Sequence, residues 1–247
     1  MPGRLPIVLL HPFPLDARFW DPVATALRAD RTVIAPDFPG LGRAPSEEAP
    51  TVDAFASAVA ELIAAEAPAG RAIVCGLSLG GYTALALAAR HPERVAALIL
   101  ADTRAEPDTP EARDGRHAAA RSVREEGSGP FLDDFVPRLV APGDAASLAT
   151  VRAIADDQAP EGIARALEAL AGRSDRRPDL PAMDVPALVI VGSEDALTPV
   201  SFAETLVAGL PDAELVVIPG AGHLTAVEAP ERFTAAVGDF LARRVDS

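Results

Sequence analysis

The segment 76–80, Gly-Leu-Ser-Leu-Gly, lies directly between an apolar run and a helix-forming run, and few folds accommodate that order. A strand that passes at once into a helix needs strained backbone, so Gly76 and Gly80 are expected to make the turn and to let its two arms pack closely. The turn would hold the Ser78 hydroxyl clear of the sheet, at a helix N-terminus that favours negative charge. An ordinary glycine-rich turn is the alternative, but the context favours a nucleophilic serine.

Short apolar runs alternate with helical patterns along most of the chain, which is typical of a parallel sheet with crossover helices. The runs predict six strands, at residues 5–10, 32–35, 72–75, 95–100, 188–191 and 214–218. Helices are predicted at residues 18–29, 52–67, from the turn to residue 90, and at 230–243, with Thr51 as an N-cap. The fold class is therefore α/β, with a mostly parallel sheet between helices.

Between the fourth and fifth runs the strand pattern stops, and helical patterns appear at residues 111–125, 129–140, 145–156 and 161–171. We expect residues 104–180 to form a helical cap inserted into a core made of residues 1–103 and 181–247. Phe131 and Phe135 cluster in this insertion with apolar neighbours. They fit a wall of an apolar pocket and internal packing of the cap equally well, because helix-face burial looks the same in both cases.

Composition narrows the possible functions. The net charge is −14 and all cations are arginine, so nothing in the sequence favours nucleic acid or an anionic membrane as a partner. A single cysteine, Cys75, excludes an internal disulfide and a cysteine-based zinc site. The apolar run at residues 7–10 is too short for a signal-peptide core or a membrane span, which predicts a cytoplasmic protein.

A serine nucleophile needs a base, and the chain has four histidines. His91 stands at a predicted helix end, His117 on a charged helix, and His11 at the end of the first strand. His223 follows the last strand in a flexible Pro-Gly-Ala-Gly-His loop. Since loops at the carboxyl ends of parallel strands converge on the edge that carries Ser78, His223 is the predicted base.

The acid that orients this base should come from another strand end. Asp195 follows the fifth strand and a glycine turn, with Thr198-Pro199 opening a helix after it. Asp102, at the end of the fourth strand, competes, since the order serine, aspartate, histidine holds for both. The turn context favours Asp195, which would otherwise be a helix-capping carboxylate.

Two backbone donors are needed for a tetrahedral oxyanion. The N–H of Leu79, directly after Ser78, is one. The loop after the first strand supplies the other: Pro12 and Pro14 have no N–H, so Phe13 is the donor available among the three residues 12–14. A rigid turn without a catalytic role is the alternative for this loop.

Together, the 11–13 loop, the Ser78 turn, the Gly-Ser-Glu-Asp segment 192–195 and the Gly-Ala-Gly-His segment 220–223 resemble the α/β-hydrolase superfamily over nearly the whole chain. Residues 10–16 and 101–104 are similar to small esterases and lactonases typified by 3-oxoadipate enol-lactonase. Pro12 stands where the family often has glycine, which stiffens the loop and keeps the Phe13 donor. The resemblance implies a six-stranded sheet, because the chain starts near the family's third strand.

The resemblance also implies a serine hydrolase that cleaves an ester or lactone of a small molecule through an acyl-enzyme, with no metal or organic cofactor. Arg104 or Arg121 would receive a substrate carboxylate, although an exposed surface position suits both. A haloalkane dehalogenase would need a carboxylate in place of Ser78. A cofactor-free perhydrolase would share these residues, and some proteins of the fold serve as ligand receptors or regulators. No sequence feature specifies an oligomeric state.

Overall fold

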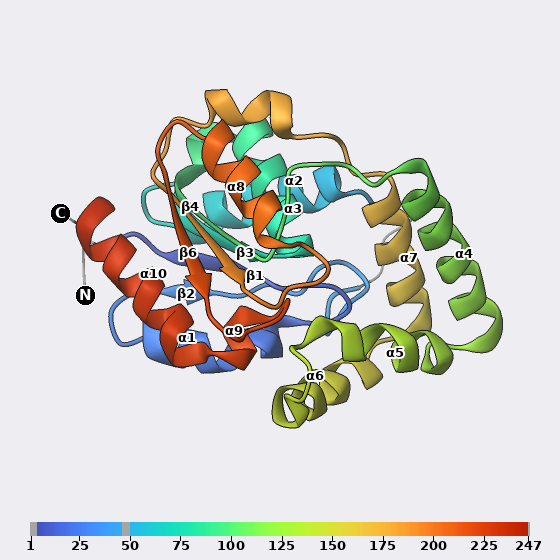
Figure 1. Ribbon diagram of the computed structural model, residues 1–247. Helices are drawn as coiled ribbons and strands as arrows, with labels where there is room; N and C mark the ends of the chain where they lie inside the picture. Colours follow the sequence, from blue (N-terminus) through green and yellow to red (C-terminus); the bar gives the residue numbers. More distant parts are fainter. Residues whose placement is uncertain (1–3, 46–49, 247) are drawn as a thin grey trace.

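A six-stranded sheet forms the centre of the computed structural model, which describes residues 4–45 and 50–246 (Figure 1). Each pair of neighbouring strands is parallel, and the spatial order is β2-β1-β3-β4-β5-β6. The strands are β1 Ile7–Leu10, β2 Val33–Ile34, β3 Ala72–Leu77, β4 Val95–Ala101, β5 Ala187–Gly192 and β6 Ala213–Ile218. The six predicted strands are confirmed, as is their parallel pairing.

Helices cover both faces of the sheet (Figure 1). On one face lie α2 (Val52–Glu66), α3 (Leu79–Arg90) and α8 (Val200–Gly209), and on the other α1 (Asp21–Leu27) and α10 (Pro230–Arg244). The hydroxyl of Thr51 accepts a hydrogen bond from the Ala54 N–H at 3.0 Å, which confirms the predicted N-cap of α2. The remaining short elements are η1 Ala17–Trp20, η2 Pro92–Arg94, η4 Arg177–Ala182 and α9 Thr225–Glu228.

The central strands are buried on both sides, which explains why they read as continuous apolar runs. Every residue of β1, β3, β4 and β5 is buried, whereas β6, at the edge of the sheet, is mostly half-buried. Their pairing aligns the strand ends: Leu77 of β3 pairs with Ala101 of β4, and Gly192 of β5 with Ile218 of β6. The loops that follow these strands therefore leave the sheet along a single edge.

The chain between β4 and β5 is helical and lies to one side of the sheet, at the right of Figure 1. Its elements are α4 Pro110–Glu126, α5 Gly129–Phe135, η3 Val136–Leu139, α6 Ala145–Asp156 and α7 Pro160–Ala171. All residues of this segment are described, and none of them is in a strand. The predicted core boundaries reach residues 1–3 and 247, which lie outside the described residues.

Two of the predicted helices are interrupted at prolines. Residues 18–29 begin as the 3-10 helix η1, and α1 starts at Asp21 so that Pro22 falls in its first turn. Residues 129–140 change from α5 to the 3-10 helix η3 next to Pro137. In a longer α-helix each proline would lack its hydrogen bond and its ring would meet the carbonyl four residues earlier.

A membrane-spanning helix is not found: within residues 4–45 and 50–246, no helix combines the length and the apolar character needed to cross a bilayer.

Candidate active site

Ser78 forms the whole turn between β3 and α3. Its backbone has φ 53° and ψ −111°, a conformation that side-chain-bearing residues rarely adopt. Three hydrogen bonds hold it there: the Ser78 N–H donates to the Ala101 carbonyl at 3.0 Å, and the Ser78 carbonyl accepts from the Tyr82 N–H at 2.9 Å and from the Thr103 hydroxyl at 3.0 Å. The strained residue is fixed by β4 and by the first turn of α3.

The flanking glycines do not make this turn, contrary to the sequence prediction. Gly76 lies inside β3, and neither Gly76 nor Gly80 has a positive φ. They are needed for close approach instead. A Cβ atom on Gly76 would lie 2.1 Å from the Gly80 carbonyl oxygen, and one on Gly80 would lie 2.0 Å from the Leu10 carbonyl oxygen. The expected close packing of strand and helix is therefore confirmed, and the strain resides in Ser78 alone.

Asp195 and His223 are in direct contact. Nδ1 of His223 lies 2.8 Å from Oδ2 of Asp195, and both side chains are buried. The Thr198 hydroxyl donates to Oδ2 at 2.6 Å, and the N–H groups of Leu197 and Thr198 donate to Oδ1 at 2.8 and 2.9 Å. Burial opposes ionisation of Asp195, but the charge of His223 and these donors prevail and hold the pKa of its carboxyl below its usual value.

Asp102, the competing acid, has a different partner. Its Oδ2 accepts from the Thr225 hydroxyl at 2.5 Å and from the Thr225 N–H at 3.2 Å, and its Oδ1 accepts from the Gly192 N–H at 3.0 Å. Burial, with the nearby charge of Asp195, raises the pKa of Asp102 well above its usual value. Asp102 thus ties the end of β5 to the segment that follows His223.

Ser78 and His223 line one cavity of about 340 Å³, together with Phe13. The predicted substrate-binding residues Phe131, Phe135 and Arg104 line it too. Its apolar wall also includes Tyr82, Ala112, Ala119, Leu139, Leu167, Leu170 and Leu197. A cavity of this size suits a small organic molecule.

The sequence left open whether Phe131 and Phe135 form a pocket wall or pack inside the protein, and in the structure these side chains of α5 do both. Phe131 and Phe135 stack on each other with ring centroids 5.2 Å apart, and Phe135 packs on Phe13 at 5.6 Å. Their neighbours Leu132 and Val136 are buried and do not line the cavity. One side of α5 therefore faces the cavity and the other packs into the interior.

The two candidate oxyanion donors are the N–H of Phe13, in the loop after β1, and the N–H of Leu79, directly after Ser78. Among the described residues, no protein acceptor is hydrogen-bonded to the N–H of Phe13 or of Leu79. Leu79 is the first residue of α3, so its N–H has no partner within the helix. The N–H of Leu15 donates to the Pro12 carbonyl at 3.0 Å, which closes the turn that carries Phe13.

Several cavity residues were not identified from the sequence. Asp108 and Arg116 line the cavity, whereas Arg121, the alternative to Arg104, is exposed and does not. Thr198, predicted only as a residue at the start of a helix, contacts both Asp195 and His223, the latter at 3.2 Å. The spacing of Arg104 and Asp108 gave no signal, because residues 104–108 form a loop and a separation of four residues brings side chains together only on a helix.

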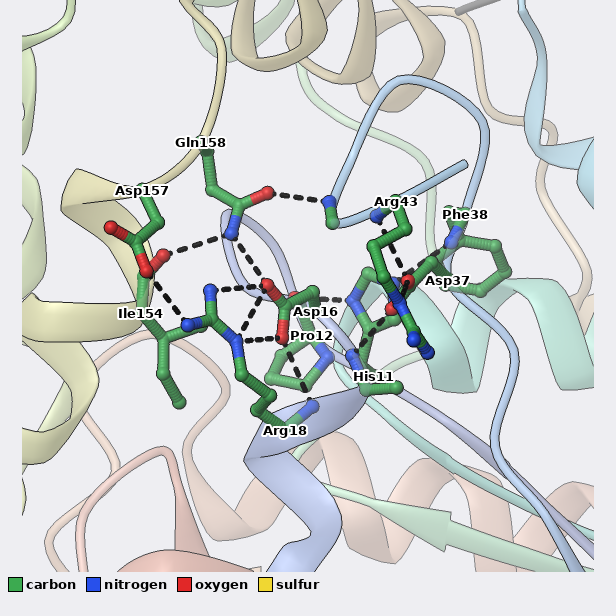
Figure 2. Close-up of polar contacts among 12 residues, drawn as sticks. His11, Pro12, Asp16, Arg18, Asp37, Phe38, Arg43, Ile154, Asp157 and Gln158 are labelled. Carbon is green, nitrogen blue, oxygen red and sulfur yellow. Dashed lines mark hydrogen bonds and ion pairs between the residues drawn. The ribbon is translucent and has the colours of Figure 1, made fainter. Parts of the chain in front are cut away.

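The remaining histidines lie elsewhere. His11 is fully buried, and its Nε2 accepts from the Phe38 N–H at 3.0 Å, as Figure 2 shows. Burial lowers the pKa of His11, so it is a neutral, structural residue. His91 caps the end of α3 and lies 3.4 Å from the Ser57 hydroxyl. His117, on α4, does not line the cavity.

A polar network holds the chain beyond Phe13 (Figure 2). The Asp16 carboxylate caps η1 and pairs with Arg18, whose other end reaches Asp157 at 2.7 Å. Gln158, between α6 and α7, donates to Asp16 at 2.8 Å and accepts from the Gly42 N–H at 2.7 Å. The helical segment is thereby joined to the loops after β1 and β2.

A model of the α/β hydrolase family matches residues 7–236. The chain is 33% identical to the pimeloyl-[acyl-carrier protein] methyl ester esterase of Aromatoleum aromaticum over 93% of this chain and 95% of that protein. Among solved structures, a thermophilic esterase from Thermogutta terrifontis matches with a TM-score of 0.92 and 37% identity, covering 97% of this chain and 90% of the other. The enol-lactonase from Burkholderia xenovorans matches with a TM-score of 0.88 and 31% identity, covering 97% and 92%.

The fold and the named relatives define an ester-cleaving hydrolase. The chain belongs to the α/β hydrolase family.

Proposed function

We propose that this protein is a serine hydrolase of a small-molecule carboxylic ester or lactone, with Ser78 as nucleophile, His223 as base and Asp195 as the acid that orients it. The contact of 2.8 Å between His223 Nδ1 and Asp195 Oδ2 carries the proposal, because it leaves Nε2 of the imidazole as the acceptor for the serine proton. Ser78 and His223 line the same cavity, where a substrate would lie between them and the solvent. Ser78 attacks the carbonyl carbon while His223 takes its proton.

The amides of Phe13 and Leu79 would stabilise the oxyanion that forms. Phe13 lines the cavity, Leu79 directly follows the cavity residue Ser78, and both N–H groups lack a protein acceptor among the described residues. Such donors are fixed before the reaction begins, so they stabilise the developing charge without reorganisation. His223 then protonates the leaving alcohol, and a water molecule repeats the two steps to release the acid.

Residues 104–180 act in this proposal as a cap that forms the substrate pocket over the 1–103 and 181–247 core. Helices α4, α5 and α7 supply cavity-lining side chains, whereas Ser78, Phe13 and His223 come from the core. Variation of the cap would therefore change the substrate without moving the reacting groups.

A free small molecule suits the site better than a substrate attached to a carrier protein. The Aromatoleum relative is named for an ester on an acyl-carrier protein. This chain carries a net charge of −14, and cap arginines such as Arg124 and Arg152 are each paired with two carboxylates. A chain of this net charge, with these two arginines already paired, offers little electrostatic attraction to an acidic partner.

The test is active-site labelling followed by turnover. A fluorophosphonate probe should label the wild type and Ser201→Ala, a control on an exposed helix residue, and should fail to label Ser78→Ala. A panel of simple esters and lactones should then be hydrolysed by the labelled proteins only. Labelling that persists in Ser78→Ala would refute the nucleophile. Labelling without any turnover would favour a ligand receptor, and turnover that needs peroxide would favour a perhydrolase.

A further inference from the structure

Three arginines surround one buried carboxylate at the cavity. Oδ1 of Asp108 lies 2.9 Å from Nη2 of Arg104 and 2.7 Å from Nη2 of Arg173, and Oδ2 lies 2.5 Å from Nε of Arg116. The Asp108 side chain is 1% exposed. Burial disfavours its charge, but the hydrogen bonds and charges of Arg173 and Arg116 outweigh burial and hold the pKa of Asp108 below its usual value.

The charges in this cluster do not balance. Among the described residues, Asp108 is the one carboxylate within ion-pair distance of Arg104, Arg116 or Arg173. At ion-pair distance, three guanidinium groups share the single negative charge of Asp108. Glu106, whose Oε2 is buried without a hydrogen-bond partner, lines a second cavity with Arg104 and Arg173, so the group of five side chains still carries one excess positive charge. A structural cluster would be expected to neutralise itself, since uncompensated buried charge is destabilising.

The three arginines differ in how many guanidinium nitrogens they leave available to a ligand in the cavity. Arg173 is 2% exposed, stacks on the Tyr82 ring at 4.5 Å and does not line the cavity, so its role is to hold Asp108. Arg116 lines the cavity and binds Asp108 through Nε only, which leaves both of its Nη groups without a partner among the described residues.

Arg104 adds a second donor on the same wall. It lines the cavity, and its Cζ lies 5.0 Å from the centroid of the Phe202 ring. Its Nε is buried with no hydrogen-bond partner. The two free Nη nitrogens of Arg116 match the two oxygens of a carboxylate, and a bidentate pair of this kind is both strong and directional.

We propose that Arg116 and Arg104 form a carboxylate-binding subsite, so that the substrate is an ester or lactone that carries a free carboxylate at its other end. This inference rests on the proposed function, because it places the ester carbonyl at Ser78 in the same cavity. Much of the remaining wall is apolar and includes Phe131, Phe135 and Leu167, while Arg138 and Thr198 also line it. An unbranched aliphatic chain between the ester and the carboxylate suits these apolar side chains.

Monomethyl esters of unbranched dicarboxylic acids with four to eight carbons test the subsite, each against the methyl ester of the monocarboxylic acid of equal length. The wild type should favour the charged ester in kcat/KM at one chain length or more. The ratio of charged to neutral kcat/KM should fall about 10- to 100-fold in Arg116→Gln, as the loss of a charge-assisted hydrogen-bond pair predicts. Arg116→Lys, which keeps the charge and loses the fork, should give an intermediate ratio.

Arg121→Gln is the matched control, since Arg121 lies exposed on the same helix and does not line the cavity. Its ratio should equal that of the wild type. Equal ratios in the wild type and Arg116→Gln, with neutral esters well cleaved, would overturn the subsite and leave the hydrolase proposal standing.

Binding separates the two proposals further. Calorimetric titration of Ser78→Ala with the free dicarboxylic acid of the preferred length should show binding that is weakened at least about tenfold by adding Arg116→Gln. Because this measurement needs no turnover, the subsite can hold even if no ester is hydrolysed. Binding unchanged by Arg116→Gln, in a double variant whose melting temperature matches that of Ser78→Ala, would refute it.

Discussion

Asp195 contacts His223 through Oδ2 and Nδ1 at 2.8 Å, whereas Asp102, the other acid at a strand end, contacts Thr225. The two carboxylates thus hold the same loop at points two residues apart. One binds the imidazole itself, and the other binds the backbone and hydroxyl that follow it. This division predicts different consequences for the two corresponding asparagine variants.

Asp195→Asn should lower kcat by about 10³- to 10⁴-fold, because an amide at this position favours the wrong tautomer of the base and leaves the imidazolium unpaired. Asp102→Asn should have the smaller effect on kcat and should instead destabilise the fold by about 1–3 kcal/mol, since both oxygens of Asp102 accept hydrogen bonds and the amide NH₂ would have to face the donors of Thr225 or the N–H of Gly192. Steady-state kinetics and urea denaturation of both variants check this. The opposite ranking in kcat would make Asp102 the acid.

The choice between these acids shows what the sequence could predict. The strand pattern placed Ser78, Asp102, Asp195 and His223 at one edge of the sheet, because parallel strands have a common direction. Which acid meets the imidazole depends on side-chain directions in loops, and sequence spacing does not determine them. The Thr198 contacts were missed for the same reason.

The glycines beside Ser78 lead to a prediction about packing. Gly80→Ala should destabilise the protein by about 3 kcal/mol or more, because its Cβ would lie 2.0 Å from the Leu10 carbonyl oxygen, and backbone cannot move aside as a side chain can. Urea denaturation measures the change. The matched control is Gly238→Ala in α10, where an added Cβ meets nothing within 4 Å. That variant should gain about 0.5–1 kcal/mol. Equal stability of the two would contradict the close approach.

His11 should make stability depend on pH. Burial lowers its pKa in the folded protein, whereas the unfolded chain binds the proton below a pKa of about 6.5. Between these two values the unfolded state binds more protons, so the His11 contribution to stability falls as the pH decreases from about 6.5 towards the folded pKa and is constant above 6.5. The slope in this window is at most about 1.4 kcal/mol per pH unit.

Comparison with His11→Gln isolates this effect, because glutamine offers an oxygen to the Phe38 N–H without titrating. Denaturation at several pH values between 5 and 8 should give a smaller slope for the variant than for the wild type. Parallel curves for the two proteins would show that His11 does not titrate on unfolding.

The helical segment was only partly predictable. Its four helices follow the apolar periodicity, but Phe131 and Phe135 line the cavity while Leu132 and Val136 are buried elsewhere, and no pattern distinguishes two apolar faces of one helix. The Asp108 cluster was missed because it joins a loop and the adjacent α4 to Arg173, the second residue after α7, which is far from them in sequence.

Gln158 provides the last prediction, since it joins that segment to the core. Its amide is buried, accepts from the Gly42 N–H at 2.7 Å, and donates to Asp16 and to the Ile154 carbonyl at 2.8 Å each. In Gln158→Leu the Gly42 N–H would lose its partner in a part-buried place, and stability should fall by about 2–3 kcal/mol. The neighbouring Asp157→Asn removes an exposed ion pair with Arg18 and should cost less than about 1 kcal/mol. Urea denaturation measures both losses. If the two variants were equally stable, Gln158 would not be what holds the helical segment to the loops after β1 and β2.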